Sequence, residues 1–290
     1  MLSLGGSMDT YQKTGYLKED FKYFHLTTEK KAPRFAYHYH DFHKVLLFLE
    51  GKVSYWVEGR SFDLLPGDIV LVPAGELHCP VLSQPTTYER IILYISPEFL
   101  SSLTDGTDTL DFCFARAARH QSNVIRLPSP YRPRLSAICS QIEEELERQK
   151  KTARLFGGAL YGKALVTQLL VLLNRGSENQ GSIFLQNTSQ NPRVLQILEF
   201  IGAHLSEDLS VERIASQFYI SRYHLMHMFK EATGYTVGNY VTLKRLLYAR
   251  SLIEKGTPVI QACYLCGYQN YSSFSRAYKK HFQESPRHSG

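Results

Sequence analysis

The chain has 290 residues, a length that suggests about two domains of ordinary size. Hydrophobic residues make up 43% of it and charged residues 21%, which is usual for a globular protein and excludes wholesale disorder. No stretch approaches the ~18 apolar residues of a membrane span, and the N-terminus lacks the pattern of a signal peptide, so we expect no membrane association.

The five cysteines are odd in number and scattered along the chain, which argues against a disulfide framework. We therefore expect a reducing compartment and a cytoplasmic protein. Cys263 and Cys266 have the spacing of half a zinc site, but no second pair completes it, so core packing is the favoured interpretation.

Positive charge is concentrated in the last third of the chain. Residues 193–290 hold 12 Lys and Arg against 7 Asp and Glu, a net charge of +5, whereas residues 1–192 hold 21 against 20, a net charge of +1. This asymmetry suits an acidic partner such as nucleic acid, although a solvated basic surface would give the same count.

Residues 21–95 predict short β-strands rich in β-branched and aromatic residues. Turn signals such as Glu50-Gly51 and Pro66-Gly67 separate the strands at intervals of ~8–12 residues, a spacing typical of a sandwich or barrel. Four of these strands are expected at residues 44–49, 52–57, 61–65 and 68–72. We predict an all-β, barrel-like first domain over residues 8–110.

Two helical patterns follow the strands. The first, at about residues 132–151, is amphipathic, and the second, at about 154–173, is apolar over much of its circumference and must be buried. We assign residues 111–175 to a helical segment that pairs two subunits, with packing across its own barrel as the alternative. Residues 176–192 are rich in Gly, Ser, Asn and Gln and predict a linker.

Residues 193–290 predict an all-helical domain with two helix-turn-helix units. The first unit spans residues 211–232 and the second spans 258–282, and each shows a short helix, a tight turn and a second helix. A long helix at about 237–254 connects them. The second helix of such a unit can enter the major groove of DNA.

Polar and aromatic residues lie near the start of each second helix, where a recognition helix reaches base edges. Arg can bind guanine, Asn can bind adenine, and Tyr or Met can pack on thymine methyl groups, whereas lysines nearer the C-termini suit phosphates. For Met226 packing remains an alternative, and for His227 a phosphate contact or no contact. The candidate base-reading residues are Arg222, Tyr223, Met226, His227, Asn270, Tyr271, Ser272, Ser275 and Arg276, and the candidate phosphate-binding residues are Lys230, Lys279 and Lys280.

Three histidines and a lysine form a candidate effector site in the first domain: His38, His40, Lys44 and His78. The first three share the strand parity that points into the barrel, and the resemblance to cupins described below implies that His78 lies opposite them. Three imidazoles and an ammonium suit an anionic or strongly hydrogen-bonding ligand, such as a carboxylate, a phosphate or a polyhydroxylated sugar. His43 has the opposite parity, so we expect it at the surface or rim.

Residues 192–288 resemble the DNA-binding domain of AraC/XylS-type transcription regulators. The resemblance rests on Ile214-Ala215, Ser221-Arg-Tyr-His-Leu225, Phe229-Lys230, Gly234, Arg245…Ala249, Gly267-Tyr268, Phe274-Ser-Arg276 and Ser285-Pro286. Ala262-Cys263 and Gln283 depart from the family's preferred Ile-Ala and Gly, at packing and capping positions. The resemblance implies sequence-specific binding to double-stranded DNA.

Residues 33–95 resemble the two motifs of cupins. In metal-dependent cupins, two histidines and a glutamate of the first motif and a histidine of the second hold the metal. His38, His40 and His78 match these positions, but Lys44 stands at the glutamate position. An ammonium there repels a divalent cation, so we predict no metal cofactor, with a metal site at the three histidines as the alternative.

The order of these segments resembles that of many AraC-type regulators. The predicted fold class is a two-domain protein, with an N-terminal all-β cupin-like barrel and following α-helices, and a C-terminal all-α domain with two helix-turn-helix motifs. We predict a transcription regulator rather than an enzyme, which binds double-stranded DNA, senses a small molecule and forms a homodimer. The alternatives are a metal-dependent cupin enzyme with an accessory DNA-binding domain and a constitutive architectural DNA binder.

Overall fold

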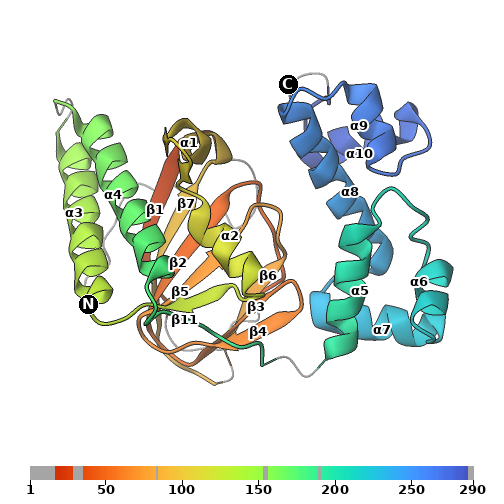
Figure 1. The fold of residues 1–290 in the computed structure, drawn as a ribbon, viewed down its shortest axis with the longest axis horizontal. Coiled ribbons are helices and arrows are strands. Elements are labelled where there is room, and N and C mark those ends of the chain that lie inside the picture. The colour runs from red at the N-terminus through yellow and green to blue at the C-terminus, as the bar shows by residue number, and fades with distance from the viewer. Residues whose placement is uncertain (1–16, 29–34, 83, 153–155, 189–190, 287–290) are drawn as a thin grey trace. The chain divides into compact units, whose positions relative to one another are not determined.

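A computed structural model describes residues 17–28, 35–82, 84–152, 156–188 and 191–286 (Figure 1). The chain divides into two compact units, residues 1–188 and residues 189–290. The first contains the β-sheets with several helices and the second is all-helical, so the predicted fold class is confirmed. The expected start of the first domain at residue 8 lies outside the described residues.

Two antiparallel sheets form the centre of the first unit. The larger has the strand order β1-β7-β2-β5-β10-β11 and the smaller has the order β4-β3-β6. Each of the four strands expected from the sequence is present within two residues of its expected bounds. The strands are β1 (Phe21–Thr28), β2 (His43–Glu50), β3 (Val53–Val57), β4 (Arg60–Asp63), β5 (Asp68–Val72), β6 (His78–Leu82), β7 (Tyr88–Ile95), β10 (Val124–Arg126) and β11 (Ile183–Phe184).

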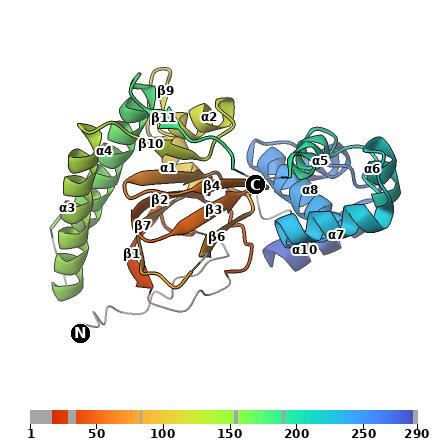
Figure 2. The ribbon, with the colours of Figure 1, turned by 90° about the horizontal axis from the view of Figure 1, so that it is seen from below.

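Strand alternation gives the larger sheet two buried faces. Leu46 and Phe48 of β2 point into a core shared with the smaller sheet, whereas Val45 and Leu47 point to the other side. There they meet the helices α1 (Pro97–Ser102), α2 (Phe112–Arg119), α3 (Tyr131–Lys151) and α4 (Gly158–Glu178). A short hairpin of β8 (Thr104–Asp105) and β9 (Asp108–Thr109) precedes α2. Figure 2 shows α3 and α4 side by side along one flank of the sheet.

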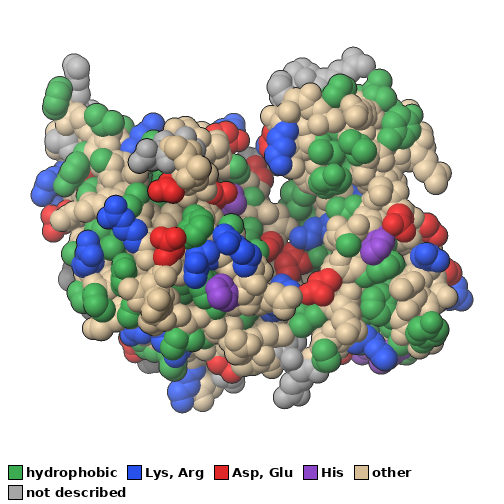
Figure 3. All heavy atoms as spheres, in the orientation of Figure 1, with side chains coloured by type: hydrophobic (Ala, Val, Ile, Leu, Met, Phe, Trp, Pro, Cys, Tyr) green, Lys and Arg blue, Asp and Glu red, His purple; other side chains and the backbone are tan. Residues whose placement is uncertain are grey.

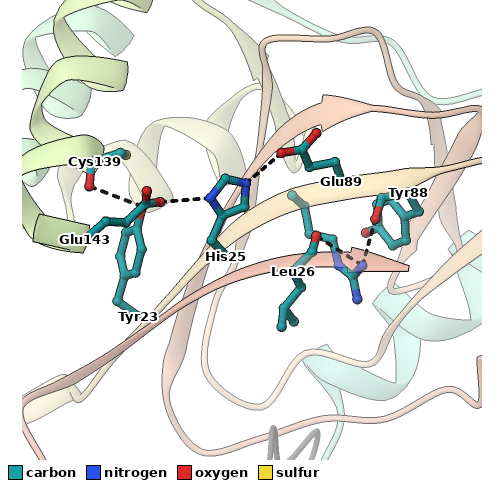
Figure 4. Close-up of polar contacts among 8 residues, drawn as sticks. Tyr23, His25, Leu26, Tyr88, Glu89, Cys139 and Glu143 are labelled. Atoms are coloured by element: carbon teal, nitrogen blue, oxygen red, sulfur yellow. Dashed lines mark hydrogen bonds and ion pairs between the residues drawn. The ribbon is translucent and has the colours of Figure 1, made fainter. Parts of the chain in front are cut away.

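A polar cluster fastens α3 to the edge of the larger sheet (Figure 4). The Tyr23 hydroxyl donates to Glu143 Oε1 of α3 at 2.8 Å. The His25 ring lies between two carboxylates, with Nδ1 2.9 Å from Glu143 and Nε2 2.8 Å from Glu89. The imidazole contacts one carboxylate with each ring nitrogen, so this arrangement joins β1, β7 and α3 through one side chain.

The stretch expected to be a linker, residues 176–192, is largely attached to the first unit. It contains the last residues of α4 and β11, which pairs with β10. Asn187 Oδ1 then accepts from the Ser61 backbone N–H at 2.9 Å, and the Thr188 N–H donates to the Ser61 carbonyl at 2.8 Å. The boundary between the two units falls after Thr188, inside this stretch.

The second unit consists of six helices in the part of it that the structure describes. They are α5 (Pro192–Ala203), α6 (Val211–Gln217), α7 (Arg222–Thr233), α8 (Val237–Glu254), α9 (Val259–Leu265) and α10 (Tyr271–Phe282). Phe229 and Tyr240 pack the first helix-turn-helix unit on the beginning of α8, and Phe274 and Tyr278 pack the second around its end. No helix among the described residues has the length and apolarity to cross a bilayer.

Candidate nucleic-acid interface and sensor pocket

The helix α7 has the composition of a recognition helix with a buried and an exposed face. Ser221 caps its N-terminus by accepting from the His224 N–H. Leu225 and Phe229 are buried against the rest of the unit, as the sequence predicted. The candidate DNA-contacting residues Arg222, Tyr223, Met226, His227 and Lys230 are all exposed, so each can reach a partner molecule.

The helix α10 presents a less uniform surface. Ser272, Arg276, Lys279 and Lys280 are exposed, whereas Tyr271 and Ser275 are half-buried. Asn270 is the N-cap, and its side-chain oxygen accepts from the Ser273 N–H at 2.8 Å. Tyr271 packs near Phe274, with ring centroids 6.2 Å apart. The structure thus exposes the charged candidates fully and engages Asn270 and Tyr271 in the helix itself.

One candidate base-reading residue, Arg222, forms an ion pair across the turn between α6 and α7. Arg222 Nη1 lies 2.7 Å from Glu212 Oε1 of α6, and both side chains are exposed. The hydrogen bond from Arg222 keeps the pKa of the Glu212 carboxyl below its usual value. Exposed pairs of this kind are weak, and a guanidinium has five donors, so Arg222 can turn to a base edge without a large cost.

Apolar side chains dominate the outward face of α9. Ile260, Tyr264 and Leu265 are exposed, and Figure 3 shows hydrophobic side chains gathered on the part of the second unit where α9 lies. A face without basic residues does not suit the DNA backbone. The basic candidates of the second helix-turn-helix unit lie on α10 instead.

The four candidate effector residues come together inside the first unit. His38, His40, Lys44 and His78 are all buried, and an isolated backbone bridge pairs His38 with His78. The His78 ring centroid lies 4.2 Å from that of His38 and 4.8 Å from that of His40. Lys44 Nζ donates to the Tyr55 hydroxyl at 2.8 Å and lies 3.4 Å from His78 Nε2.

Backbone carbonyls fix the orientation of all three imidazoles. Nδ1 of His38 lies 3.0 Å from the Ala36 oxygen, Nδ1 of His40 2.6 Å from the Phe42 oxygen, and Nδ1 of His78 2.9 Å from the Glu76 oxygen. A carbonyl can only accept, so each Nδ1 carries the hydrogen and each Nε2 of a neutral ring is an acceptor.

The charge state of the histidines follows from burial. Burial first, and the Lys44 charge second, hold the pKa of His40 and of His78 well below its usual value, so both rings are neutral. His40 Nε2 is buried and has no hydrogen-bond partner among the described residues. An acceptor in that position calls for a donor from elsewhere.

The Lys44 charge argues against a divalent metal ion at these three histidines. Nothing in the described part of the chain groups three or more His, Cys, Asp or Glu side chains in a way that could hold a metal. The Lys44 ammonium stands beside His78 Nε2, where a cupin metal would need its ligands to converge. Cys263 and Cys266 are both buried in the core of the second helix-turn-helix unit.

Arg90 is a pocket residue that the sequence analysis missed. It lies on the same face of β7 as Tyr88 and Ile92 and lines, with Lys44 and Tyr55, a small cavity in the first unit. Its guanidinium donates to the Tyr88 carbonyl at 2.9 Å and to Thr28 Oγ1 at 2.6 Å. Arg90 forms no ion pair with a described residue. Strand parity from Tyr88 to Ile92 was the available signal.

The cavity is nearly filled by its own lining. Its volume is about 10 Å³, room for a single water molecule. The aromatic side chains Phe35, Tyr55 and Tyr88 contribute to the wall. A larger ligand therefore requires these side chains to move.

His43 is half-buried, which is compatible with the expected rim position but not with an open surface. The residue does lie on the opposite face of β2 from Lys44, but that face is covered by α2, and the His43 ring packs on Phe114 with centroids 4.8 Å apart. Burial lowers the pKa of His43 to about 4. A helix distant in the sequence, which strand parity cannot reveal, occupies the expected surface.

Comparisons with known proteins bear on both units. Residues 214–289 match a family described as a helix-turn-helix domain, and residues 24–165 match a family described as an AraC-like ligand binding domain.

Relatives align with nearly the whole chain. The HTH-type transcriptional activator RhaS of Enterobacter sp. (strain 638) is 26% identical over 268 residues, covering 90% of this chain and 90% of the relative. The probable transcriptional regulator LumQ of Photobacterium leiognathi is 26% identical over 255 residues, covering 87% of this chain and 90% of the relative. These relatives are transcription regulators, not enzymes.

Solved structures give weaker matches. A transcriptional regulator from Chromobacterium violaceum with an AraC-type DNA-binding domain is 29% identical, covers 36% of this chain and 93% of that chain, and has a TM-score of 0.33. ToxT from Vibrio cholerae O395 is 14% identical, covers 93% of this chain and 96% of that chain, and has a TM-score of 0.36.

The two matched families occur in one chain, in the order that the sequence predicted, and a protein named as a transcriptional activator aligns with about nine-tenths of it. The chain belongs to the AraC family of transcription regulators, with an N-terminal AraC-type ligand-binding domain and a C-terminal helix-turn-helix domain that binds DNA.

Proposed function

We propose that this regulator reads its operator with both α7 and α10 and answers to a small effector bound inside the first unit. The observation that carries the proposal is the pair of capped recognition helices, each with an exposed arginine: Arg222 at the first position of α7 and Arg276 near the middle of α10. We infer the cytoplasm as its location because the DNA and the five free cysteines both suit it. Relatives named as activators support activation as the direction of control.

DNA binding by these helices has a salt-dependent and a sequence-dependent part. Lys230, Lys279 and Lys280 supply phosphate contacts, which carry no sequence information but release counterions. Fluorescence anisotropy of the full chain on its own upstream DNA, across a salt series, separates the two. Lys280→Ala should weaken binding to specific and random duplexes alike and reduce the salt slope by about 1. Unchanged salt dependence in all three lysine variants would remove these residues from the interface.

The effector site pairs acceptors with cations. Lys44 and Arg90 offer donors and positive charge from the cavity wall, which His38 also lines, whereas His40 Nε2 is a buried acceptor behind that lining that needs a donor. A small molecule that carries hydroxyl groups and an anionic group, or hydroxyl groups alone, would satisfy this set. The cavity of about 10 Å³ requires the aromatic wall to open for it, so binding and a change of side-chain packing are linked.

A thermal-shift screen of the full chain against sugars, sugar acids, small carboxylates and metals tests the effector. We expect a hydroxylated or anionic compound to raise the melting temperature of the wild type and to lose its effect in His40→Phe and Arg90→Met. Lys52→Met, which removes an exposed lysine of the same unit, is the matched control. A hit that survives all three substitutions binds elsewhere and would remove the barrel from consideration.

Lys44 gives a separate test of the absence of metal. We expect the chelator-treated wild type to hold metal weakly or not at all, and Lys44→Glu to bind Zn²⁺ or Ni²⁺ more tightly, because the substitution restores the cupin ligand set. Calorimetry and metal analysis on both proteins, with Lys52→Glu as the charge-matched control, decide the question. A stoichiometric, tightly held metal in the wild type would make the three histidines a metal site.

We propose that α3 and α4 pair two copies of the chain. Phe156 is exposed just before α4, and Leu160 and Tyr161 are exposed in its first turn. An open groove of about 320 Å³ between α3 and α4 is lined by Ile138 and Val171, among others. Two-fold pairing would place two DNA-binding domains on repeated half-sites.

The oligomeric state tests this surface. Light scattering should give a dimer for the wild type and a monomer for Leu160→Glu. Leu65→Glu, at an exposed leucine elsewhere in the same unit, is the control and should stay dimeric. A wild type that is monomeric at micromolar concentrations would contradict the pairing.

A further inference from the structure

The two helix-turn-helix units meet around one arginine. Arg245 lies near the middle of α8, and Figure 1 shows α6 and α7 towards one end of this helix and α9 and α10 towards the other. Arg245 Nε donates to the Leu205 carbonyl oxygen at 2.9 Å, and Nη2 donates to the Glu207 carbonyl oxygen at 2.5 Å. Both carbonyls belong to the loop between α5 and α6, directly before the first helix-turn-helix unit.

The turn between α9 and α10 lies against the same arginine and the same loop. Gly267 has a φ of +85°, and a Cβ at this position would overlap the Leu205 carbonyl oxygen and lie 2.9 Å from the guanidinium carbon of Arg245. Burial raises the pKa of Cys266 and of Tyr268, which flank this glycine, to about 12, and the nearby Arg245 charge opposes the rise. Three segments far apart in the sequence therefore touch at Arg245.

The chemistry of this junction differs from the packing around it. Apolar side chains pack both helix-turn-helix units against α8. Apolar contacts have no strict direction, so they allow one helix-turn-helix unit to rotate relative to the other. A guanidinium is planar, and its hydrogen bonds to two carbonyls have a fixed geometry. A contact between the α5–α6 loop and Gly267 without room for a Cβ adds a second constraint.

We propose that Arg245, together with the Leu205 carbonyl and Gly267, is a positioning residue that fixes the separation and rotation of α7 relative to α10. The junction thereby sets the spacing between the two DNA segments that one chain reads. This inference rests on the proposal that both helices contact bases. Arg245 itself needs no contact with DNA for this role.

The test measures tolerance to spacing rather than affinity alone. Full-length wild type and Arg245→Met each select binding sites from duplexes with a random central region, and the selected DNAs are sequenced. The wild type should select two sequence blocks at one separation. Inserting one base pair between them shifts the second block by about 3.4 Å and about a tenth of a turn, and should weaken wild-type binding about tenfold.

In Arg245→Met the blocks should appear at several separations, and the same insertion should weaken binding less than about threefold. Arg245→Lys, which keeps the charge without the planar fork, should resemble Arg245→Met rather than the wild type. A phosphate-binding role for Arg245 would instead lower affinity at every spacing and leave the preferred separation unchanged.

A pair of glycines supplies a matched control. Gly267→Ala should loosen the spacing as Arg245→Met does. Gly256 has almost the same φ, +86°, but no atom within 4 Å of its hypothetical Cβ, so Gly256→Ala adds similar backbone strain without touching the junction and should keep the wild-type spacing. This pair decides the question if Arg245→Met fails to fold, as circular dichroism would show.

The outcomes separate the two levels of the proposal. A folded Arg245→Met with the wild-type penalty for insertion, or a Gly267→Ala that behaves like Gly256→Ala, overturns the inference alone. A wild type that selects only one sequence block shows that the two helices do not both read bases, and overturns the proposed function with it.

Discussion

The turns of the two helix-turn-helix units both contain a left-handed residue shortly after the first helix but use different residues for it. In the first, Tyr219 adopts a φ of 53° and is 95% exposed, and in the second, Gly267 takes the equivalent position with a φ of 85°. The C-caps of the second helices show the reverse choice, because α7 ends at Gly234 with a φ of 74° and α10 ends at Gln283 with a φ of 59°.

The difference between these positions separates two reasons for a glycine. A left-handed backbone disfavours a side chain by roughly 1–2 kcal/mol, a cost that an exposed Tyr219 or Gln283 shows to be tolerable. At Gly267 the neighbouring Leu205 carbonyl also leaves no room for a Cβ. The conformation alone permits other residues, whereas the close approach of another segment does not.

The largest expected effect tests this distinction directly. Gly267→Ala should lower the free energy of unfolding by about 2–4 kcal/mol, because strain and overlap add, whereas Gly256→Ala should lose about 1 kcal/mol from strain alone. Urea denaturation of the full chain, followed by helical circular dichroism, provides the measurement. Similar losses in both variants would mean that the overlap at Gly267 relaxes easily.

The recognition helices provide the second comparison. Arg222→Ala on α7 and Arg276→Ala on α10 should each reduce discrimination between operator and mutated operator by about 1–3 kcal/mol. Lys230→Ala and Lys280→Ala should weaken binding to both DNAs equally. Competition binding with single-base operator variants measures the difference. Equal losses on specific and random DNA for all four variants would sink the division into base readers and phosphate binders.

Exchanging the C-caps sharpens the comparison at a smaller scale. Gly234→Gln should destabilise the protein by about 1 kcal/mol, and Gln283→Gly should stabilise it by about 0.5–1 kcal/mol, because glycine adopts the left-handed conformation without a Cβ penalty. The Gln283 side chain donates to the Lys280 carbonyl, and the loss of this bond reduces the gain. Denaturation midpoints of the two variants should therefore move in opposite directions.

The smallest expected effect concerns the ion pair between Arg222 and Glu212 in the first helix-turn-helix unit. It has no counterpart among the described residues of the second helix-turn-helix unit. Glu212→Gln should leave stability unchanged, since both partners are exposed. It should tighten binding to random duplex DNA about two- to threefold, because a negative charge beside Arg222 is removed. Asp208→Asn, at an exposed carboxylate before α6, is the control for charge alone.

The sequence predicted most of the elements because their patterns are local. Strand alternation in β2 and β5, and the buried Leu225 and Phe229 on α7, follow from periods of two and 3.6 residues that neighbouring side chains reveal. The candidate DNA residues were found in the same way, as the face opposite the core.

Features that depend on distant segments escaped the sequence analysis. His43 is covered by Phe114, Arg90 faces the same cavity as Lys44, and β11 pairs with β10 inside the stretch expected to be a linker. The salt bridge of Arg222 to Glu212 and the contact of Gly267 with the Leu205 carbonyl belong to the same class. Each is a tertiary contact that no local period encodes.

The burial of every cysteine has a practical consequence. Cys79, Cys113, Cys139, Cys263 and Cys266 are all free and buried. Burial raises the pKa of Cys113, Cys139 and Cys266 to about 12, so these thiols react with alkylating reagents only when the surrounding structure opens. The protein thus carries natural reporters of local unfolding in the β-sheet core, in the helices beside it and in the second helix-turn-helix unit. Residue-resolved alkylation rates, measured with and without DNA or effector, would show which of these regions each ligand holds closed.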